Sequence, residues 1–315
     1  MDDWVAKRGL SLIEARRLRQ LSERSDAQGL LQLGSQLIAL AVTGTGIVQF
    51  WGSWWAVPFF LAHGLLINCL YAGQHEMSHW TAFKSRWLNN VAGAAIGFVV
   101  IYPAMWDRWF HFAHHRNTQN WDKDAELLAR GRYTLASYLL YLSGLTYWYG
   151  RARSTLRLAF GIVPPYATWL NAEQRRQVIA EARWHVAGYA AIALLSLILR
   201  SWLAVALWLA PMLAMKWFHQ LQNIGEHTGM THRSDTLQNT RTLIVPAWVR
   251  WLMWNMPYHA AHHTFPGVPF HALPRLHDEI EGGLGQKLPS AGYFAAQAAI
   301  LRMLWRGPEP LEPVS

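Results

Sequence analysis

Cysteine is almost absent from this chain of 315 residues, which contains only Cys69. A single cysteine cannot form an intramolecular disulfide, so nothing in the sequence implies an oxidising compartment. It also excludes an iron–sulfur cluster of the CxxC or plant ferredoxin type within this chain, because such clusters need several thiolate ligands.

Charged residues are also scarce, at 15% of the chain, compared with about 25% in soluble domains. The 48 residues from Ala27 to Gln74 contain no Asp, Glu, Lys or Arg. A membrane helix needs roughly 20 apolar residues, so this tract predicts two spans joined by a tight turn around residues 51–54. A second tract, residues 184–215, is interrupted only by Arg200 and predicts another hairpin with shorter arms.

The positive charges are distributed unevenly around these two tracts. Six Lys and Arg residues precede the first tract, 13 lie between the tracts and eight follow the second, whereas the hairpin tips hold only Arg200. The positive-inside rule then places both termini, and the segments at roughly 74–183 and 217–315, in the cytoplasm. The net charge of +9 is explained by topology and by anionic lipid headgroups, so no nucleic-acid partner is expected.

Three regions follow from this reading. Residues 1–28 form a cytoplasmic amphipathic segment and no signal peptide, since charges stand where an apolar core would begin. Residues 29–305 form a single membrane domain, and residues 306–315 form a flexible tail. The apolar side of the predicted N-terminal helix consists of Leu10, Leu12, Ile13, Leu18 and Leu21.

A further apolar run at residues 87–106 is long enough to be mistaken for a fifth span. If it crossed the membrane, His111 would emerge on the opposite side from His75 and His79. Asn89, Asn90 and Pro103 also make it a poor lipid-exposed helix. We therefore interpret it as a re-entrant or interfacial segment packed on protein.

Histidine is concentrated in three short motifs, "QHEMSHW", "WFHFAHHRNTQ" and "YHAAHHTF". Residues three and four apart share one face of a helix, and neutral imidazole is the commonest side-chain metal ligand. Eight histidines exceed the four ligands of one tetrahedral zinc, so the motifs predict two metal ions on one membrane face. The predicted ligands are His75, His79, His111, His114, His115, His259, His262 and His263.

The order HxxxH, HxxHH and HxxHH, placed after membrane hairpins, resembles the membrane fatty acid desaturase and hydroxylase superfamily. The flanks "HEMSHWTAFKSRWLNNVAG", "FHFAHHRNTQNWDKDAEL" and "NMPYHAAHHTFPGVPFHALPRLH" resemble the bacterial fatty acid desaturases in particular, over about residues 30–285. The resemblance implies two irons that activate O₂ as co-substrate. It also implies removal of two hydrogens from an unactivated acyl segment, with electrons from an outside donor.

A fourth motif, "NIGEHTG", matches a further element of that family. The resemblance implies that His227 completes the ligand set and that Asn223 holds a water on one metal. Imidazole suits several transition metals, so the assignment of iron follows from the resemblance and not from the ligand type. Carboxylates that could orient the ring N–H groups are Glu76, Asp107, Asp122, Asp124, Glu226 and Asp278.

The sequence thus predicts an all-α integral membrane protein with four transmembrane helices in two hairpins and a cytoplasmic helical cap that holds a dimetal site. Its predicted function is O₂-dependent fatty acyl desaturation in the bacterial inner membrane, with the acyl chain in a tunnel of apolar and aromatic side chains. The haem-binding signature HPGG is absent. The resemblance therefore implies a separate electron donor of the ferredoxin or cytochrome b5 type.

Two alternatives stay open at this stage. A hydroxylase, a ketolase or an amino-lipid desaturase would use the same irons on another substrate. A membrane zinc hydrolase or a metal-binding receptor would use no redox chemistry. The three-residue spacing of the first motif and a histidine at position 259 weigh against acyl-CoA Δ9 and front-end desaturases. Outside the motifs, His63 lies in an apolar span, where we expect a neutral ring that is hydrogen-bonded between helices.

Overall fold

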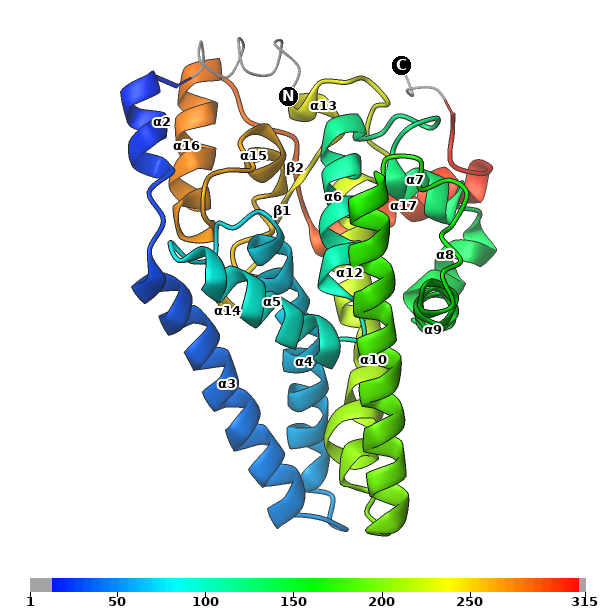
Figure 1. The fold of residues 1–315 in the computed structure, drawn as a ribbon. Coiled ribbons are helices and arrows are strands. Elements are labelled where there is room, and N and C mark those ends of the chain that lie inside the picture. Colours follow the sequence, from blue (N-terminus) through cyan, green and yellow to red (C-terminus); the bar gives the residue numbers. More distant parts are fainter. Residues whose placement is uncertain (1–12, 312–315) are drawn as a thin grey trace.

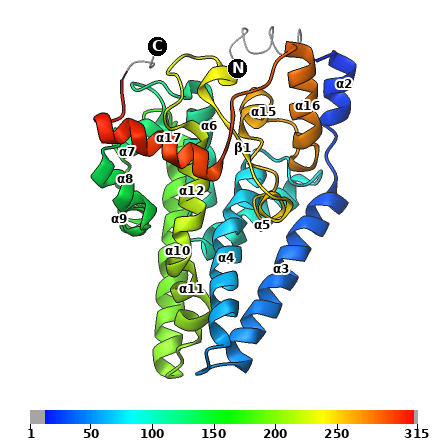
Figure 2. The same ribbon diagram turned by 180° about the vertical axis from the view of Figure 1, so that it is seen from behind.

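The computed structural model describes residues 13–311, and its regular structure is mostly helical (Figure 1). The predicted apolar positions Leu10 and Leu12 lie outside the described residues. The first described helix, α2 (Ala15–Leu21), buries Leu21. Long helices extend from a cap of short helices, and both α2 and the last helix, α17, lie at the cap end (Figures 1 and 2).

Three described helices are long and apolar enough to cross a membrane: α3 (Asp26–Gln49), α4 (Ala56–Ser78) and α10 (Ala172–Ile198). The turn between α3 and α4 carries Trp54, which is 90% exposed. The first predicted hairpin is therefore confirmed as two long apolar helices with a short turn. Helix α10 begins earlier than its apolar tract, because Asn171 and Gln174 form a capping box at its N-terminus.

The fourth predicted span is not one continuous helix. Its residues form a π-helix, η1 (Val205–Leu209), and a short helix, α11 (Ala210–Ala214), which is followed by α12 (Lys216–His227). Pro211 lies at the start of α11 and has no N–H for the helical ladder. The number of apolar residues was sufficient to predict a short span. It could not reveal the π-helix or the break at Met215 between α11 and α12.

The apolar run at residues 87–106 is bent. Helices α5 (Arg86–Val99) and α6 (Ala104–Asn117) meet at 102° across a break of a few residues. Pro103 precedes α6, and the carboxylate of Glu181 on α10 accepts hydrogen bonds from the N–H groups of Ala104 and Met105. A carboxylate at a helix N-terminus satisfies otherwise unpaired donors and complements the helix dipole. The bend directs α6 into the cap.

The cap is built from short helices on both sides of α12 (Figure 2). It also contains two strands, β1 (Thr242–Ile244) and β2 (Ser290–Gly292), which pair in parallel. The structure is mostly helical, but this small sheet departs from the predicted all-α class. Strands of only three residues are too short to be recognised from the sequence. The remaining elements are α7 (Ala125–Arg130), α8 (Leu135–Leu142), α9 (Leu145–Ala159), α13 (Thr236–Asn239), α14 (Ala247–Leu252), α15 (His259–Thr264), η2 (Phe270–Ala272), α16 (Leu273–Leu284) and α17 (Tyr293–Arg306).

Helix α4 and the broken segment after α10 pack closely at Gly64. A Cβ at this position would overlap the backbone carbonyl of Pro211. One turn away, the side-chain amide of Asn68 donates to the carbonyls of Gly64 and Met212. The ring of His63 bridges to Thr43 Oγ1 at 2.7 Å and to the Leu207 carbonyl at 2.9 Å, which agrees with the role expected for it between helices.

The predicted tail includes a residue that is held against the cap. Glu309 is 1% exposed, and its carboxylate accepts two hydrogen bonds from Arg130, at 2.6 and 3.0 Å. The backbone of Tyr133 exchanges hydrogen bonds with the same residue. This contact attaches the segment after α17 to the C-terminal end of α7 and the residues before α8.

Candidate metal centre

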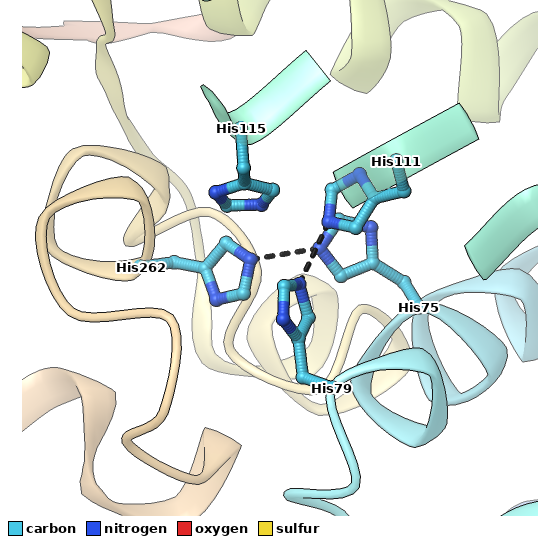
Figure 3. A group of neighbouring side chains, drawn as sticks. All are labelled: His75, His79, His111, His115 and His262. Atoms are coloured by element: carbon cyan, nitrogen blue, oxygen red, sulfur yellow. Dashed lines mark hydrogen bonds between the residues drawn. The ribbon is translucent and has the colours of Figure 1, made fainter. Parts of the chain in front are cut away.

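The first group of histidines joins α4, α6 and α15 (Figure 3). Its members are His75, His79, His111, His115 and His262, and one ring nitrogen of each lies within 4.8 Å of those of the others. The Nε2 atoms of His75 and His262 are 2.9 Å apart, and those of His79 and His111 are 2.8 Å apart. Two histidines of the first motif, two of the second and one of the third thus point at one another.

The second group lies beside the first and adds α12. His114, His227 and His263 offer ring nitrogens within 4.8 Å of one another. His259 joins them, because its Nε2 is 3.1 Å from Nε2 of both His227 and His263. The rings of His115 and His263 stack at 4.0 Å and connect the two groups. All nine predicted histidines are therefore brought together.

The geometry fits a pair of metal ions better than a hydrogen-bonded histidine cluster. Metal–nitrogen bonds of roughly 2.0–2.1 Å place neighbouring ligand nitrogens about 3 Å apart, as several of these nitrogens are. Among residues 13–311, neither ring nitrogen of His115 has a hydrogen-bond partner. Buried polar atoms are normally satisfied, and a metal would satisfy the ring nitrogens directed into the groups.

Burial keeps these rings in the form that binds metal. Desolvation, and to a smaller extent the charge of the neighbouring His114, lowers the pKa of His227 to about 3. Desolvation and adjacent imidazoles also lower the pKa values of His259, His262 and His263 well below that of free histidine. Neutral imidazole has the free lone pair that a metal needs, so these four rings are ready to bind at neutral pH. His114 differs, because burial is outweighed by the charge and hydrogen bond of Asp124, which raise its pKa to about 9.

One of the carboxylates singled out in the sequence contacts a ring of the second group directly. Asp124 Oδ1 lies 2.8 Å from Nδ1 of His114, and Asp124 is itself fixed because it accepts from the N–H groups of Gln119 and Glu126. A carboxylate on Nδ1 leaves Nε2 free for a metal and raises its basicity. The N-terminus of α7 thus orients His114.

The other acids differ in their relation to the site. Glu226 Oε2 is 3.5 Å from His259 Nε2, and Glu76 Oε1 is 3.9 Å from His262 Nδ1. Asp107 instead accepts hydrogen bonds from Tyr71, Gln74 and Ser78. Within the part of the chain that the structure describes, Asp122 and Asp278 make no ion pair or hydrogen bond with the nine histidines.

Three residues that support the site were not singled out in the sequence. Thr118 Oγ1 lies 3.2 Å from Nδ1 of His263, and the backbone carbonyl of Asn239 lies 3.2 Å from Nδ1 of His227. The Gln119 amide donates to the His227 carbonyl. Thr118 and Gln119 are the last two residues of the second motif, so their position was a usable signal, whereas Asn239 is brought in only by the fold.

A sequence model described as "Fatty acid desaturase" matches residues 17–294. The chain belongs to the fatty acid desaturase family. The match covers the three histidine motifs, His227 and the three long apolar helices, so the whole site just described lies within the part of the chain that this family shares.

Individual relatives agree with this family. The chain is 24% identical to an sn-1 oleoyl-lipid 12-desaturase of Picosynechococcus, over 80% of this chain and 77% of the relative. It is 21% identical to a fatty acid desaturase of Bacillus subtilis, over 85% and 82%. A ferredoxin-dependent sn-1 acyl-lipid omega-3 desaturase of Nostoc is 30% identical, but only over 25% of this chain and 22% of the relative. As a member of this family the chain is an oxidoreductase, a membrane fatty acid desaturase.

A cavity of about 410 Å³ opens onto both groups of histidines in this desaturase. Asn223 lines it four residues before His227 on α12 and is hydrogen-bonded to Tyr141. Aromatic rings dominate the walls as expected, but many carry hydroxyls, and charged residues also face the space. The predicted apolar tunnel is therefore more polar than expected. The polar lining includes Tyr71, Tyr102, Tyr133, Tyr141, Tyr147, Tyr166, Arg130, Arg151, Glu126 and Glu226.

Proposed function

We propose that the chain is an acyl-lipid desaturase that removes two hydrogens from an acyl chain in the cavity, with nine histidines as ligands of two irons. The convergence of two histidine groups at one wall of an aromatic-lined cavity carries the proposal. Bound irons in this family activate O₂. The chain's own residues hold the ions, orient the rings and exclude water from the reacting carbons.

The first iron would be held by the group of five histidines shown in Figure 3. The second would be held by His114, His227, His259 and His263, with Asn223 positioned on the cavity wall to hold a water. Asp124 would keep His114 in the tautomer that presents Nε2. Replacing Asn223 by Ala should leave the iron content intact and reduce turnover, and loss of iron in this variant would argue against a water-holding role.

The membrane arrangement is part of the proposal. Four crossings, by α3, α4, α10 and the segment at 203–215, would place the histidines and both termini on one side of the membrane. That side carries most of the Lys and Arg residues, which favours the cytoplasm. The turn between α3 and α4 would then face the opposite side.

Thiol labelling of intact cells tests this orientation. Ser53 is exposed in the turn between α3 and α4, and Gln286 is exposed in the cap after α16. The native Cys69 is buried, so an introduced cysteine provides the accessible thiol. A membrane-impermeant reagent added outside the cytoplasm should label Ser53→Cys and leave Gln286→Cys unlabelled. The reverse pattern would show that the cap lies on the outer side.

The names of the relatives support a proposal for the substrate and the electron donor. Several are named as oleoyl-lipid 12-desaturases, and one is named with ferredoxin. We therefore propose an acyl chain on a lipid and an acidic electron carrier that docks on the cap. Exposed cations of the cap would attract such a carrier: Arg116, Lys123, Arg132 and Arg233. If anionic ferredoxins fail to support turnover at every ionic strength, the donor assignment is wrong.

Product analysis tests the reaction. Expression in a host of known lipid composition should yield a lipid that has lost two hydrogens, and His262→Ala should abolish that product. A product that has gained one oxygen atom would instead indicate a hydroxylase, which shares the initial hydrogen abstraction. No lipid change, together with activity that needs no O₂, would favour a zinc hydrolase.

A further inference from the structure

Helix α9 separates the cavity from the outside of the protein. Tyr147, Gly150, Arg151 and Ser154 line the cavity, and their spacing of three and four residues places them on one face of the helix. A different face exposes large apolar side chains, as expected for a helix at a membrane surface. These exposed residues are Leu145, Tyr149, Leu156 and Phe160.

Arg151 is the charged residue on the cavity face of α9. Its guanidinium carbon lies 3.5 Å from the ring centroid of Tyr102 and 5.1 Å from that of Tyr147. Among residues 13–311, no carboxylate lies within ion-pair distance of it. Arginine is always protonated, so this cation lies in the cavity with aromatic rings around it and no paired anion.

The side chain of Lys216 is a second basic group, and it also lies over the ring of Tyr147. Lys216 Nζ is 3.7 Å from the ring centroid of Tyr147 and 3.3 Å from His219 Nδ1, and the residue is 2% exposed. Asp107, the acid whose charge acts on Arg151, already accepts hydrogen bonds at both carboxylate oxygens. Desolvation lowers the pKa of Lys216 well below that of free lysine, so Arg151 is the fixed charge at this end of the cavity. A charge taken out of water normally needs a partner, and none of the described acids forms an ion pair with Arg151.

The basic end is continuous with the histidine site. Tyr102 stacks on Tyr71 at 5.6 Å, and Tyr71 meets His75 edge-on at 6.3 Å. Arg151, Tyr102, Tyr71 and His75 all line the same cavity. A molecule with its end group on Arg151 could therefore extend along the two tyrosines toward the first group of histidines.

We infer that Arg151 binds the anionic end group, a carboxylate or a phosphate, of the acyl substrate and so determines which carbons reach the histidine site. The inference rests on the proposed desaturase function. It narrows the substrate class to acyl compounds with an anion close to the chain, since a guanidinium pairs with a carboxylate or a phosphate through two parallel hydrogen bonds. In an acyl lipid the chain itself ends in a neutral ester, so the anion that pairs with Arg151 would be the phosphate of the headgroup.

Binding to the purified full-length protein in detergent tests this inference. The probes are dodecanoate, its methyl ester and dodecyl phosphate, measured by calorimetry. Arg151→Gln should raise the Kd for the anionic probes by about 10- to 100-fold, the usual effect of losing a charge-assisted hydrogen bond, and leave the ester unaffected. Arg153→Gln is the matched control, because Arg153 is exposed on the same helix, and it should bind all probes like the wild type.

The comparison between anions identifies the source of the end group. Tighter binding of dodecyl phosphate indicates a lipid phosphate and agrees with the proposed acyl-lipid substrate. Tighter binding of dodecanoate indicates a free fatty acid and would contradict the proposed lipid carrier. If Arg151→Gln does not fold, Arg151→Lys keeps the charge without the planar fork and should still weaken anion binding several-fold. Equal affinity of the wild type for dodecanoate and its methyl ester would overturn the inference, as would an equal loss in Arg153→Gln.

These outcomes are separable from failure of the desaturase proposal. Iron content and lipid products are measured on the same protein samples. If Arg151→Gln desaturates lipid and binds the anionic probes like the wild type, Arg151 does not bind the end group, but the desaturase proposal still stands. If anion binding depends on Arg151 but the protein contains no iron and forms no desaturated product, the proposed reaction is wrong and the anion site at Arg151 still stands.

Discussion

At the scale of single residues, the site depends on side chains that set the orientation of the rings. The histidines themselves follow from their spacing, but a ring can bind metal through either nitrogen. Asp124 resolves this for His114, because its carboxylate lies at Nδ1 and leaves Nε2 toward His227. The metal site is thus defined as much by this contact as by the ligand itself.

Replacing Asp124 by Asn should weaken metal binding about tenfold or more. The neutral amide cannot raise the basicity of His114 as the carboxylate does. Its NH₂ group would also face a backbone N–H of Gln119 or Glu126, from which the carboxylate now accepts. The measurement is a titration of metal content against a chelator. Asp122→Asn is the control, because Asp122 is exposed, and equal loss in both variants would contradict the role of Asp124.

The sequence could predict the nine histidines as a set, but not how they are shared between the two groups. His114 and His115 are adjacent in the chain and belong to different groups, because successive helical residues point in different directions. His259 and His262 likewise separate. The division depends on the angles at which α4, α6, α12 and α15 meet, and local spacing carries no information about those angles.

At the scale of elements, close helix packing positions the ligands. Helix α4 carries His75 and His79 at its end, and an earlier turn of it lies against α11 through Gly64. The long apolar helices were predictable from composition because charge is excluded from them. The π-helix and the break at Met215 were not, because apolar residues are compatible with both a continuous and an interrupted helix.

Gly64→Ala should lower the melting temperature of the protein, because its Cβ would force α4 away from the Pro211 backbone. The expected shift is several degrees, as for other overpacked contacts costing about 1–3 kcal/mol. Gly34→Ala is the matched control in α3, since nothing lies within 4 Å of a Cβ there. It should be neutral or stabilising through helix propensity. A harmless Gly64→Ala would contradict the packing described.

At the scale of the whole molecule, distant parts of the chain close the cavity. The segment after α17 is attached to α7 by the pair of Arg130 and Glu309, whose side chains are 13% and 1% exposed. Arg130 also lines the cavity and lies over the ring of Tyr133. The sequence of this segment, rich in proline, indicated a free tail, and only the fold reveals its partner, which is 179 residues away in the chain.

Glu309→Ala should destabilise the protein by about 3–5 kcal/mol, because it leaves the Arg130 cation buried without its partner. Thermal unfolding of the purified protein measures this. Glu173→Ala removes an acid from the exposed pair with Arg176 and should leave the melting temperature nearly unchanged. Similar melting temperatures for both variants would show that the contact with α7 is dispensable.

The central claim is that nine histidines hold two irons beside the acyl cavity, and metal analysis of the purified protein tests it most directly. The account predicts two irons per chain, with iron lost in His262→Ala from the first group and in His263→Ala from the second. His185→Ala, on α10 with its ring bonded to Tyr189, should keep both. A protein with about one zinc and no iron, and with activity that is independent of O₂, would contradict it.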